Sequence, residues 1–331
     1  MSCIIRPIPT PDIRPSQSAL ESFRQNLGAY EPEFWELEYQ VTPYLRNLPL
    51  DMLMRRYMDL VRNFNYLVSV DRYAIPSPSF LSSWYWHRKE HQTRLELHIR
   101  RIQPPVAPPQ AVFSEPVSGE PRRPKYPNAG DVLYKYASDR WASDLFLRGE
   151  TRLSSAGYYG RLNGDEARQD DELQKRNSLF GQTVTVTSAD GRNIPVIGDV
   201  SVAHQGPDYY MFCVACDWDA RLLDEFDVDR CVVITNTDAF ADRIRSATAE
   251  KLDGWHFHHN PVEYFDPHEQ HLGGYINHAM AKDFRFAYQR EYRFVWMHPQ
   301  ATESREEHLG ISIGALGNCA ELWSASGQIA D

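Results

Sequence analysis

A dense run of prolines is the feature that most constrains how this 331-residue chain can fold. Between residues 103 and 130 the sequence holds Pro104, Pro105, Pro108, Pro109, Pro116, Pro121, Pro124 and Pro127. Proline fixes φ and lacks a backbone N–H, so this density excludes a continuous helix and a central strand. We therefore predict an extended linker at 103–130, with an N-terminal module at 1–102 and a second domain at 131–331.

The chain is long enough to bury two cores, and its 8 Trp, 18 Tyr and 15 Phe supply large side chains for them. No segment approaches the roughly 18 consecutive apolar residues of a membrane span, and the N-terminus lacks the apolar stretch of a signal peptide. Five cysteines, an odd number in a long chain, argue against a disulfide framework. We expect a cytoplasmic protein with no membrane partner.

The N-terminal module has the sequence pattern of helices. Apolar residues recur at helical spacing across 49–70, Ser18 and Glu21 form a capping box, and a further helix is expected across 80–102. These patterns predict a small helical bundle. Such a module either docks a partner protein or is a structural extension that packs on the second domain.

Most of the net charge belongs to the second domain. Residues 1–102 carry 13 Lys and Arg against 11 Asp and Glu, whereas residues 131–331 carry 19 against 32. That excess of acid would repel a nucleic-acid backbone. The aromatic and basic stretch 84–101 is the only candidate nucleic-acid surface, and an ordinary amphipathic helix explains it equally well.

Short apolar runs bounded by turn residues indicate that the second domain is α+β. Strands are expected at 132–136, 151–155, 182–187, 209–216, 231–235 and 294–297, and a helix at 238–252. The acidic segment 163–172 lacks the ligand spacing of a calcium loop. It is either a solvated helix start or a substrate-recognition loop.

Cys213 and Cys216 form a C-x-x-C pair, but they lie inside an apolar strand pattern rather than at a helix N-terminus. We expect them to be buried, reduced and free of metal. The histidines scattered over 256–278 would be needed to complete a zinc site, and neither a second C-x-x-C nor an H-E-x-x-H accompanies them. The sequence therefore predicts no metal centre.

Glu291 occupies an unusual position, at the start of an apolar strand pattern that contains Tyr292, Phe294 and Trp296. A carboxylate there loses solvation unless a cation or hydrogen-bond donor meets it. Because side chains alternate along a strand, Glu291 shares one face with Arg293. Two interpretations follow: an edge strand that carries a Glu–Arg ion pair, or a functional carboxylate that faces a cleft.

Three motifs together carry a family resemblance. They are the strand Asp131-Val132-Leu133-Tyr134-Lys135-Tyr136, the strand that ends in Ser154-Ser155 with Tyr158-Tyr159 just beyond, and the late Gln289-Arg290-Glu291. The combination resembles the ADP-ribosyltransferase superfamily, in which such strands converge on NAD. It is more similar to a poorly characterised bacterial family that opens with Tyr-Lys-Tyr and closes with Tyr-Gln-x-Glu-Tyr-Arg.

The resemblance implies a split-sheet fold in which NAD, as a substrate, lies in a cleft between two short sheets. Glu291 would hold a ribose hydroxyl, and Gln289 would orient the acceptor. Lys135 would meet the pyrophosphate or ribose, and Tyr158 or Tyr159 would stack on nicotinamide. The implied NAD-binding set is completed by Tyr136, Arg152, Ser154 and Ser155. The implied target is a macromolecule, protein or nucleic acid, and the implied role is that of a bacterial toxin, effector or phage-defence protein.

Two other classes of function stay open. Lys135 and Tyr136 stand where transferases usually have Arg or His, and the gap between Ser155 and Gln289 is long. These departures favour a non-catalytic interaction or sensor protein on the same fold. The third class is a nucleic-acid-directed toxin, for which the sequence offers no metal–carboxylate cluster.

Overall fold

The computed structural model describes residues 3–7, 32–67, 83–106, 131–268, 277–300 and 306–324, arranged as two compact units. The first unit comprises Met1–Gln110, Arg176–Ala203 and Phe265–Tyr275, and the second comprises Ala111–Lys175, His204–Tyr264 and Ile276–Asp331. Residues 176–203 and 265–275 therefore group with the N-terminal helices rather than with the domain expected at 131–331. Packing in space, not order along the chain, decides this grouping. Linker residues 107–130 lie outside the described residues.

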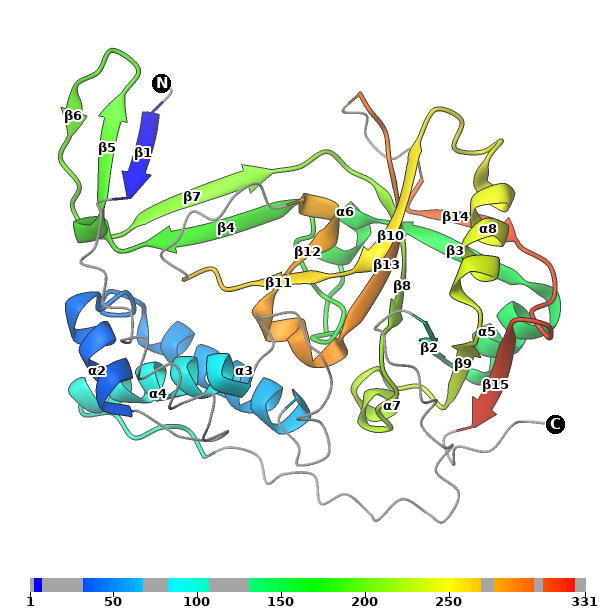
Figure 1. Ribbon diagram of the computed structural model, residues 1–331, viewed down its shortest axis with the longest axis horizontal. Helices are drawn as coiled ribbons and strands as arrows, with labels where there is room; N and C mark the ends of the chain where they lie inside the picture. Colours follow the sequence, from blue (N-terminus) through cyan, green and yellow to red (C-terminus); the bar gives the residue numbers. More distant parts are fainter. Residues whose placement is uncertain are drawn as a thin grey trace, which may run out of the picture. The chain divides into compact units, whose positions relative to one another are not determined.

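The first unit contains the predicted N-terminal helices (Figure 1). Its elements are β1 (Cys3–Pro7), α2 (Pro32–Val41), α3 (Leu50–Leu67), α4 (Ser83–Ile99), η4 (Gly181–Thr183), β5 (Val184–Ser188) and β6 (Asn193–Ile194). Helix α4 packs against both α2 and α3, and the core between them contains Tyr39, Leu45, Leu53 and Leu97. The capping box expected at Ser18 lies outside the described residues. None of the described helices has the length and apolar character needed to cross a bilayer.

A small antiparallel sheet of order β1-β5-β6 completes the first unit. Its middle strand β5 overlaps the strand expected at 182–187, but it begins at Val184 because Gly181–Thr183 form η4. Strands β4 (Gln174–Leu179) and β7 (Val200–Gln205) pair with each other, and the boundary between the units falls inside both. Within the first unit, Arg56 and Asp266 form a fully buried ion pair at 2.7 Å.

The second unit is built on an antiparallel sheet with the order β10-β13-β8-β2-β9-β15, to which β3 and β14 attach. Its strands are β2 (Leu133–Ala137), β3 (Glu150–Ser155), β8 (Tyr210–Ala215), β9 (Arg230–Ile234), β10 (His256–Pro261), β13 (Glu291–Met297), β14 (His308–Ser312) and β15 (Ala320–Ser324), with β11 (Glu263–Phe265) and β12 (Ala281–Asp283) as a separate pair. Its helices are α5 (Asp139–Ser143), η3 (Asp144–Arg148), α6 (Ala156–Gly160), α7 (Arg221–Glu225), α8 (Thr237–Thr248), η5 (His278–Met280) and η6 (Phe284–Gln289).

Strand β13 lies in the interior of this sheet, between β10 and β8. The edge-strand interpretation of Glu291 is therefore wrong. The two faces of β13 differ in chemistry. Phe294 packs against Phe240 of α8, with ring centroids 5.4 Å apart, whereas Glu291 and Arg293 belong to the opposite, polar face.

The sheet splits along one edge of β8. That edge pairs with β3 at Tyr210 and Met211, and with β2 only at Ala215. The other edge pairs with β13 along the whole strand. The backbone of β8 between Met211 and Ala215 therefore faces the gap where β2 and β3 diverge, and Lys135 Nζ donates a hydrogen bond to the carbonyl of Cys213 there (2.8 Å).

The turn from η3 into β3 depends on Gly149. Its φ is +69°, and a Cβ placed on it would lie 2.2 Å from the carbonyl oxygen of Gly314. We expect Gly149→Ala to lower the free energy of unfolding by about 3 kcal/mol, because a left-handed backbone and a backbone clash both add to the cost. Urea denaturation measures the loss. Gly164→Ala is the matched control: Gly164 has φ +79° with no atom within 4 Å of an added Cβ, so only about 1 kcal/mol should be lost. Equal losses in the two variants would contradict the close approach.

Candidate functional site

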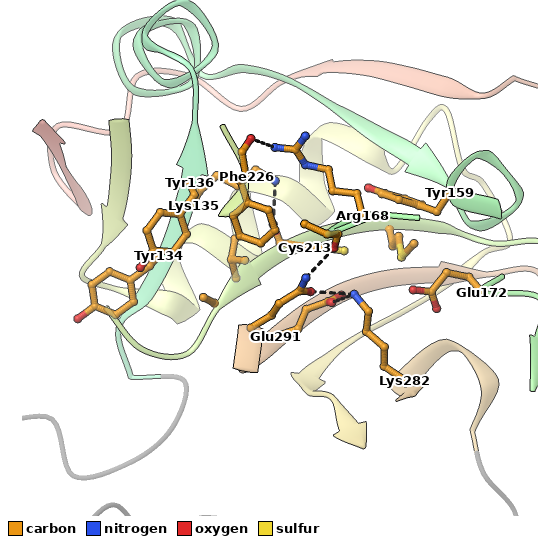
Figure 2. A pocket seen from close by; sticks show the side chains of 15 residues that line it. Tyr134, Lys135, Tyr136, Tyr159, Arg168, Glu172, Cys213, Phe226, Lys282 and Glu291 are labelled. Atoms are coloured by element: carbon orange, nitrogen blue, oxygen red, sulfur yellow. Dashed lines mark hydrogen bonds and ion pairs between the residues drawn. The ribbon is translucent and has the colours of Figure 1, made fainter. Parts of the chain in front are cut away.

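A cavity of about 100 Å³ lies in the second unit at the split in the sheet (Figure 2). Its walls come from β2, α6, the segment 167–172, β8, the loop after α7, β12 and the junction of η6 with β13. It is lined by Tyr134, Lys135, Tyr136, Tyr159, Ala167, Arg168, Glu172, Met211, Cys213, Val214, Ala215, Phe226, Lys282, Gln289 and Glu291. Aromatic rings, cations and carboxylates thus share one small space.

Five residues that the sequence placed in the candidate site line this cavity: Lys135, Tyr136, Tyr159, Gln289 and Glu291. More than 120 residues of the chain separate the first three of them from the last two. The fold therefore brings the Tyr-Lys-Tyr strand and the Gln-x-Glu turn together. Only the tertiary structure could do so, because the strands that carry them are separated by β8 in the sheet.

The other four predicted residues lie off the cavity. Arg152 is exposed and stacks on the ring of Trp141 at 5.2 Å. The Ser154 hydroxyl lies 3.1 Å from His308 Nδ1. Ser155 is buried where β3 meets β8, and Tyr158 packs edge-on against His308 with ring centroids 4.4 Å apart. Ser154 and Ser155 are consecutive on β3 and so face opposite sides of the strand, and neither contributes to the lining of the cavity.

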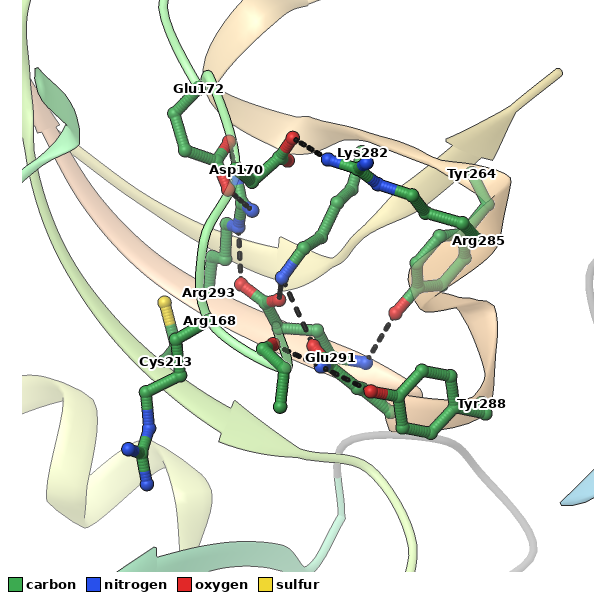
Figure 3. Close-up of polar contacts among 12 residues, drawn as sticks. Arg168, Asp170, Glu172, Cys213, Tyr264, Lys282, Arg285, Tyr288, Glu291 and Arg293 are labelled. Carbon is green, nitrogen blue, oxygen red and sulfur yellow. Dashed lines mark hydrogen bonds and ion pairs between the residues drawn. The ribbon is translucent and has the colours of Figure 1, made fainter. Parts of the chain in front are cut away.

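Glu291 is held by two cations (Figure 3). Lys282 Nζ donates to Glu291 Oε2 and Arg293 Nε donates to Oε1, each at 2.5 Å. The Glu291 backbone N–H donates to the hydroxyl of Tyr264 (2.8 Å). A carboxylate offers about four acceptor positions, and these two hydrogen bonds occupy one on each oxygen. The sequence suggested either a Glu–Arg ion pair or a carboxylate that faces a cleft. Glu291 does both, since it pairs with Arg293 and lines the cavity.

A second carboxylate, Glu172, extends this network. Arg293 donates to it from both Nη atoms, at 2.6 and 2.9 Å, and Lys175 Nζ donates at 3.1 Å. Arg293 has no exposed surface and also donates to the carbonyl of Ala279 (3.0 Å). Buried ions are tolerated only when they are paired and hydrogen-bonded in this way.

The network sets the charge of each member. Burial alone would raise the pKa of Glu291, but Arg293 and Lys282 outweigh it and hold that pKa well below its usual range. Burial would also raise the pKa of Glu172, but the charges of Arg293 and Lys175 outweigh it and lower that pKa to about 2. Burial alone would lower the pKa of Lys282, but the negative charges of Glu291 and Glu172 outweigh burial, so this pKa is raised. Both carboxylates are therefore ionised at neutral pH.

The turn that presents Gln289 and Glu291 contains a backbone outlier. Arg290 has φ 46° and ψ 52°, the left-handed region, which costs a residue other than Gly roughly 1 kcal/mol. Its guanidinium bonds to Asp217 at 2.7 Å, and its carbonyl accepts the N–H of Cys216 at 2.7 Å. These contacts hold the chain as it passes from η6 into β13. Such outliers concentrate at functional sites.

The opposite wall of the cavity carries Lys135 and Tyr136. Burial lowers the pKa of the half-buried Lys135 ammonium, whose Nζ also lies over the ring of Phe212 at 4.5 Å. Tyr136 accepts the N–H of Asp219 (2.8 Å) and stacks on Trp218, so its ring is fixed. An ammonium has three donors, and the Cys213 carbonyl takes one of those of Lys135. A cation beside rigid aromatic rings suits a flat, electron-rich or anionic ligand.

The amide of Gln289 is largely occupied by the protein itself. Its Nε2 donates to the Ala167 carbonyl (2.6 Å) and to the Tyr288 hydroxyl (3.3 Å), and its Oε1 accepts from Lys282 (3.0 Å). The side chain joins the segment 163–172 to the Gln-x-Glu turn. In this arrangement it supports the cavity wall.

Sequence reasoning missed three charged residues of the site: Arg168, Glu172 and Lys282. Arg168 bonds to the Phe226 carbonyl (2.8 Å) and lies over the Phe226 ring. The segment 163–172 that supplies two of them is not a solvated helix start, since Glu172 is buried and the segment is a series of turns. Lys282 stands beside Asp283 in a mixed charged and apolar stretch, so the local sequence contains no signal that its side chain would reach Glu291.

The cysteines and histidines form no metal site within the described residues, where no group of three or more His, Cys, Asp or Glu could hold an ion. Cys213, Cys216, Cys231 and Cys319 are free thiols. Cys213 and Cys216 are half-buried rather than fully buried as expected, because Cys213 faces the cavity and Cys216 follows the end of β8. Burial raises the pKa of Cys216 to about 12, so this thiol is unreactive at neutral pH.

Comparison of the chain with known protein families, with curated protein sequences and with solved structures found no match.

Proposed function

We propose that this protein is an NAD-dependent ADP-ribosyltransferase with a split-sheet catalytic domain that modifies a macromolecular target. The observation that carries the proposal is the buried Glu291 carboxylate, paired with Lys282 and Arg293, which lines one cavity with Lys135, Tyr136 and Tyr159 at the gap in the sheet. These residues come from the Tyr-Lys-Tyr, Tyr-Tyr and Gln-x-Glu motifs, the three that carry the family resemblance.

The size of the cavity suggests which part of NAD it would hold. About 100 Å³ is below the roughly 300–1,000 Å³ of typical ligand pockets, so the cavity would take one end of a dinucleotide. We assign the nicotinamide riboside end to it. Tyr136 and Tyr159 offer ring faces to nicotinamide, and Lys135 and Arg168 offer positive charge to the pyrophosphate.

The chemistry asks for one well-placed carboxylate. Loss of nicotinamide leaves positive charge on the ribose, as in other glycosyl transfers through oxocarbenium-like transition states. Glu291 is buried at 6% exposure, ionised and able to accept further hydrogen bonds, so it suits the stabilisation of that charge. Its two cations hold it in place without using all its acceptor positions.

A second candidate is a non-catalytic NAD-binding or sensor protein. Its supporting observation is that both Glu291 oxygens and both ends of the Gln289 amide already have partners within the protein. A site built only for binding needs no free carboxylate. Binding without cleavage of NAD is the result that would favour it.

The proposal is tested by incubating the purified protein with NAD and a cell extract, with separate labels on nicotinamide and on adenosine. We expect nicotinamide to be released and the adenosine label to appear on a macromolecule, which protease or nuclease digestion would identify as protein or nucleic acid. Calorimetry with NAD alone separates the two candidates. Binding without release supports the sensor function, and absence of both overturns the proposal.

A further inference from the structure

The outer face of the ribbon formed by β3 and β14 carries polar side chains. Arg152 and Ser154 alternate with the core residue Leu153 along β3, so they share the face that points away from the core. In the antiparallel register, Ser154 is paired with His308 and Arg152 with Gly310. No atom lies within 4 Å of a Cβ added to Gly310, so the ribbon is open beside Arg152.

Arg152 is positioned without an anion. Its guanidinium lies over the ring of Trp141 at 5.2 Å, and neither an ion pair nor a hydrogen bond joins its side chain to any other described residue. The neighbouring Arg148 and Arg161 differ, because each is paired with a glutamate. A guanidinium presents five donors in a planar fork that matches a carboxylate. The fork of Arg152 is therefore open to a carboxylate from another molecule.

Trp141 adds apolar surface at the same place. Its side chain is 46% exposed, and within the described part of the second unit it shares high exposure, among large apolar residues, only with Leu147. The exposed Arg140 guanidinium also lies over the Trp141 ring, at 5.5 Å. Tryptophan and arginine are the residue types most enriched at the centres of protein interfaces. This combination favours a partner that offers both apolar atoms and negative charge.

The other end of this face lies beside the cavity. Ser154 Oγ is 3.1 Å from His308 Nδ1, and the ring of Tyr158 packs edge-on against His308 at 4.4 Å. The Tyr158 ring in turn contacts that of Tyr159, with centroids 5.5 Å apart, and Tyr159 lines the cavity. A chain segment bound along the ribbon from Trp141 would therefore end next to the cavity.

We propose that the outer face of β3 and β14, between Trp141 and Tyr158, binds an extended acidic segment of the protein that this site modifies. The inference rests on the proposed function and adds the chemistry of the target. Carboxylates of the segment pair with Arg152, and its apolar atoms pack on the exposed ring of Trp141. The segment is held on the ribbon while a neighbouring residue of the target enters the cavity.

The surrounding charge favours such a peptide over a nucleic acid. Glu150 and Glu307 are exposed on either side of the face, and residues 131–331 carry 19 Lys and Arg against 32 Asp and Glu. A nucleic acid has a charge at every nucleotide and is repelled by this field. A peptide with a few carboxylates can place one on Arg152 and keep the others in solvent.

The binding test uses the full chain and a fluorescein-labelled peptide of alternating Glu and Thr, followed by fluorescence anisotropy. We expect this peptide to bind more tightly than the matching Gln–Thr peptide and than a single-stranded oligodeoxynucleotide of equal length. Trp141→Ala and Arg152→Gln should each weaken its binding by at least about fivefold. Arg245→Gln removes an exposed, ion-paired guanidinium from α8 and is the matched control, with wild-type affinity expected.

Three results would overturn the inference: equal affinity for the two peptides, tighter binding of the oligodeoxynucleotide, or wild-type affinity in both Trp141→Ala and Arg152→Gln. Circular dichroism confirms that the variants are folded. Because Trp141 is exposed and Arg152 makes no ion pair within the described residues, both changes should leave the unfolding temperature near that of the wild type.

A second measurement separates this inference from the proposed function. With labelled NAD and a cell extract, Trp141→Ala should transfer at least about fivefold less label to protein than the wild type does. Its release of nicotinamide without extract should be unchanged, because Trp141 does not line the cavity. Wild-type transfer in this variant, or an equal loss of transfer and release, would overturn the inference. Peptide binding by a protein that releases no nicotinamide would instead overturn the proposed function and still support the acidic-peptide surface.

Discussion

Replacing Glu291 by Gln should lower the rate of nicotinamide release by about 10²–10³-fold, the usual effect of removing one preorganised electrostatic group. The amide keeps the shape of the carboxylate but cannot stabilise positive charge on the ribose. It also leaves Lys282 without its closest anion, so we expect stability to fall by about 3 kcal/mol. Activity should therefore be measured well below the melting temperature of the variant, with circular dichroism to confirm folding.

Asp266→Asn is the matched control. Asp266 is a buried carboxylate paired with Arg56 at 2.7 Å, as Glu291 is paired with Arg293, but it belongs to the first unit and does not line the cavity. It should lose a similar amount of stability and retain nicotinamide release. Full activity in Glu291→Gln, or an equal loss of activity in the two variants, would show that Glu291 is purely structural.

The second large expected effect is a loss of folding stability at low pH, which depends on Glu172. Its folded pKa of about 2 lies below its ordinary value because the cations Arg293 and Lys175 outweigh burial. A depressed pKa stabilises the folded state above the unfolded value, near 4.5, and this stability is lost as the pH falls towards 2. We expect the free energy of unfolding to fall by about 3 kcal/mol across that window from this group alone. Urea denaturation at a series of pH values measures it.

Glu172→Gln should remove most of that acid sensitivity and cost about 3–5 kcal/mol at neutral pH, because Arg293 and Lys175 keep their buried charges with one anion fewer. Asp242→Asn breaks an exposed pair with Arg245 and should leave both stability and its pH dependence unchanged within error. If Glu172→Gln retains the wild-type slope between pH 5 and pH 2, the network does not control acid unfolding.

Local patterns predicted much of the fold. Strands β8 and β9 are apolar runs bounded by turns, and α3 and α8 carry apolar residues at helical spacing, so neighbouring residues alone encode them. Strand β10 was missed because His256, His258 and His259 resemble a polar loop, and only pairing with β13 makes that sequence a strand. Strands β14 and β15 were missed for a similar reason: each is short and gains its stability from a partner.

Some features of the candidate site could likewise be predicted from the local sequence, and others could not. The Glu291–Arg293 pair was predictable because alternation along a strand is a local rule. That β13 lies inside the sheet, that Lys282 approaches from β12, and that Glu172 approaches from a distant turn are tertiary facts with no local signal. Ser154 illustrates the limit: the motif marked it for NAD, whereas the register of β3 with β14 sets it against His308.

The position of β13 between β8 and β10 also has a consequence for biosynthesis. Its partners occupy residues 210–215 and 256–261, so both emerge from the ribosome before β13. Until β13 is made, the edge of each partner that pairs with it stays unpaired. Pairings this distant in sequence form slowly, and exposed strand edges are prone to association. Because Glu291 enters with β13, the cavity cannot be completed until nearly 300 residues have been translated. The cavity therefore forms only after most of the chain has been translated.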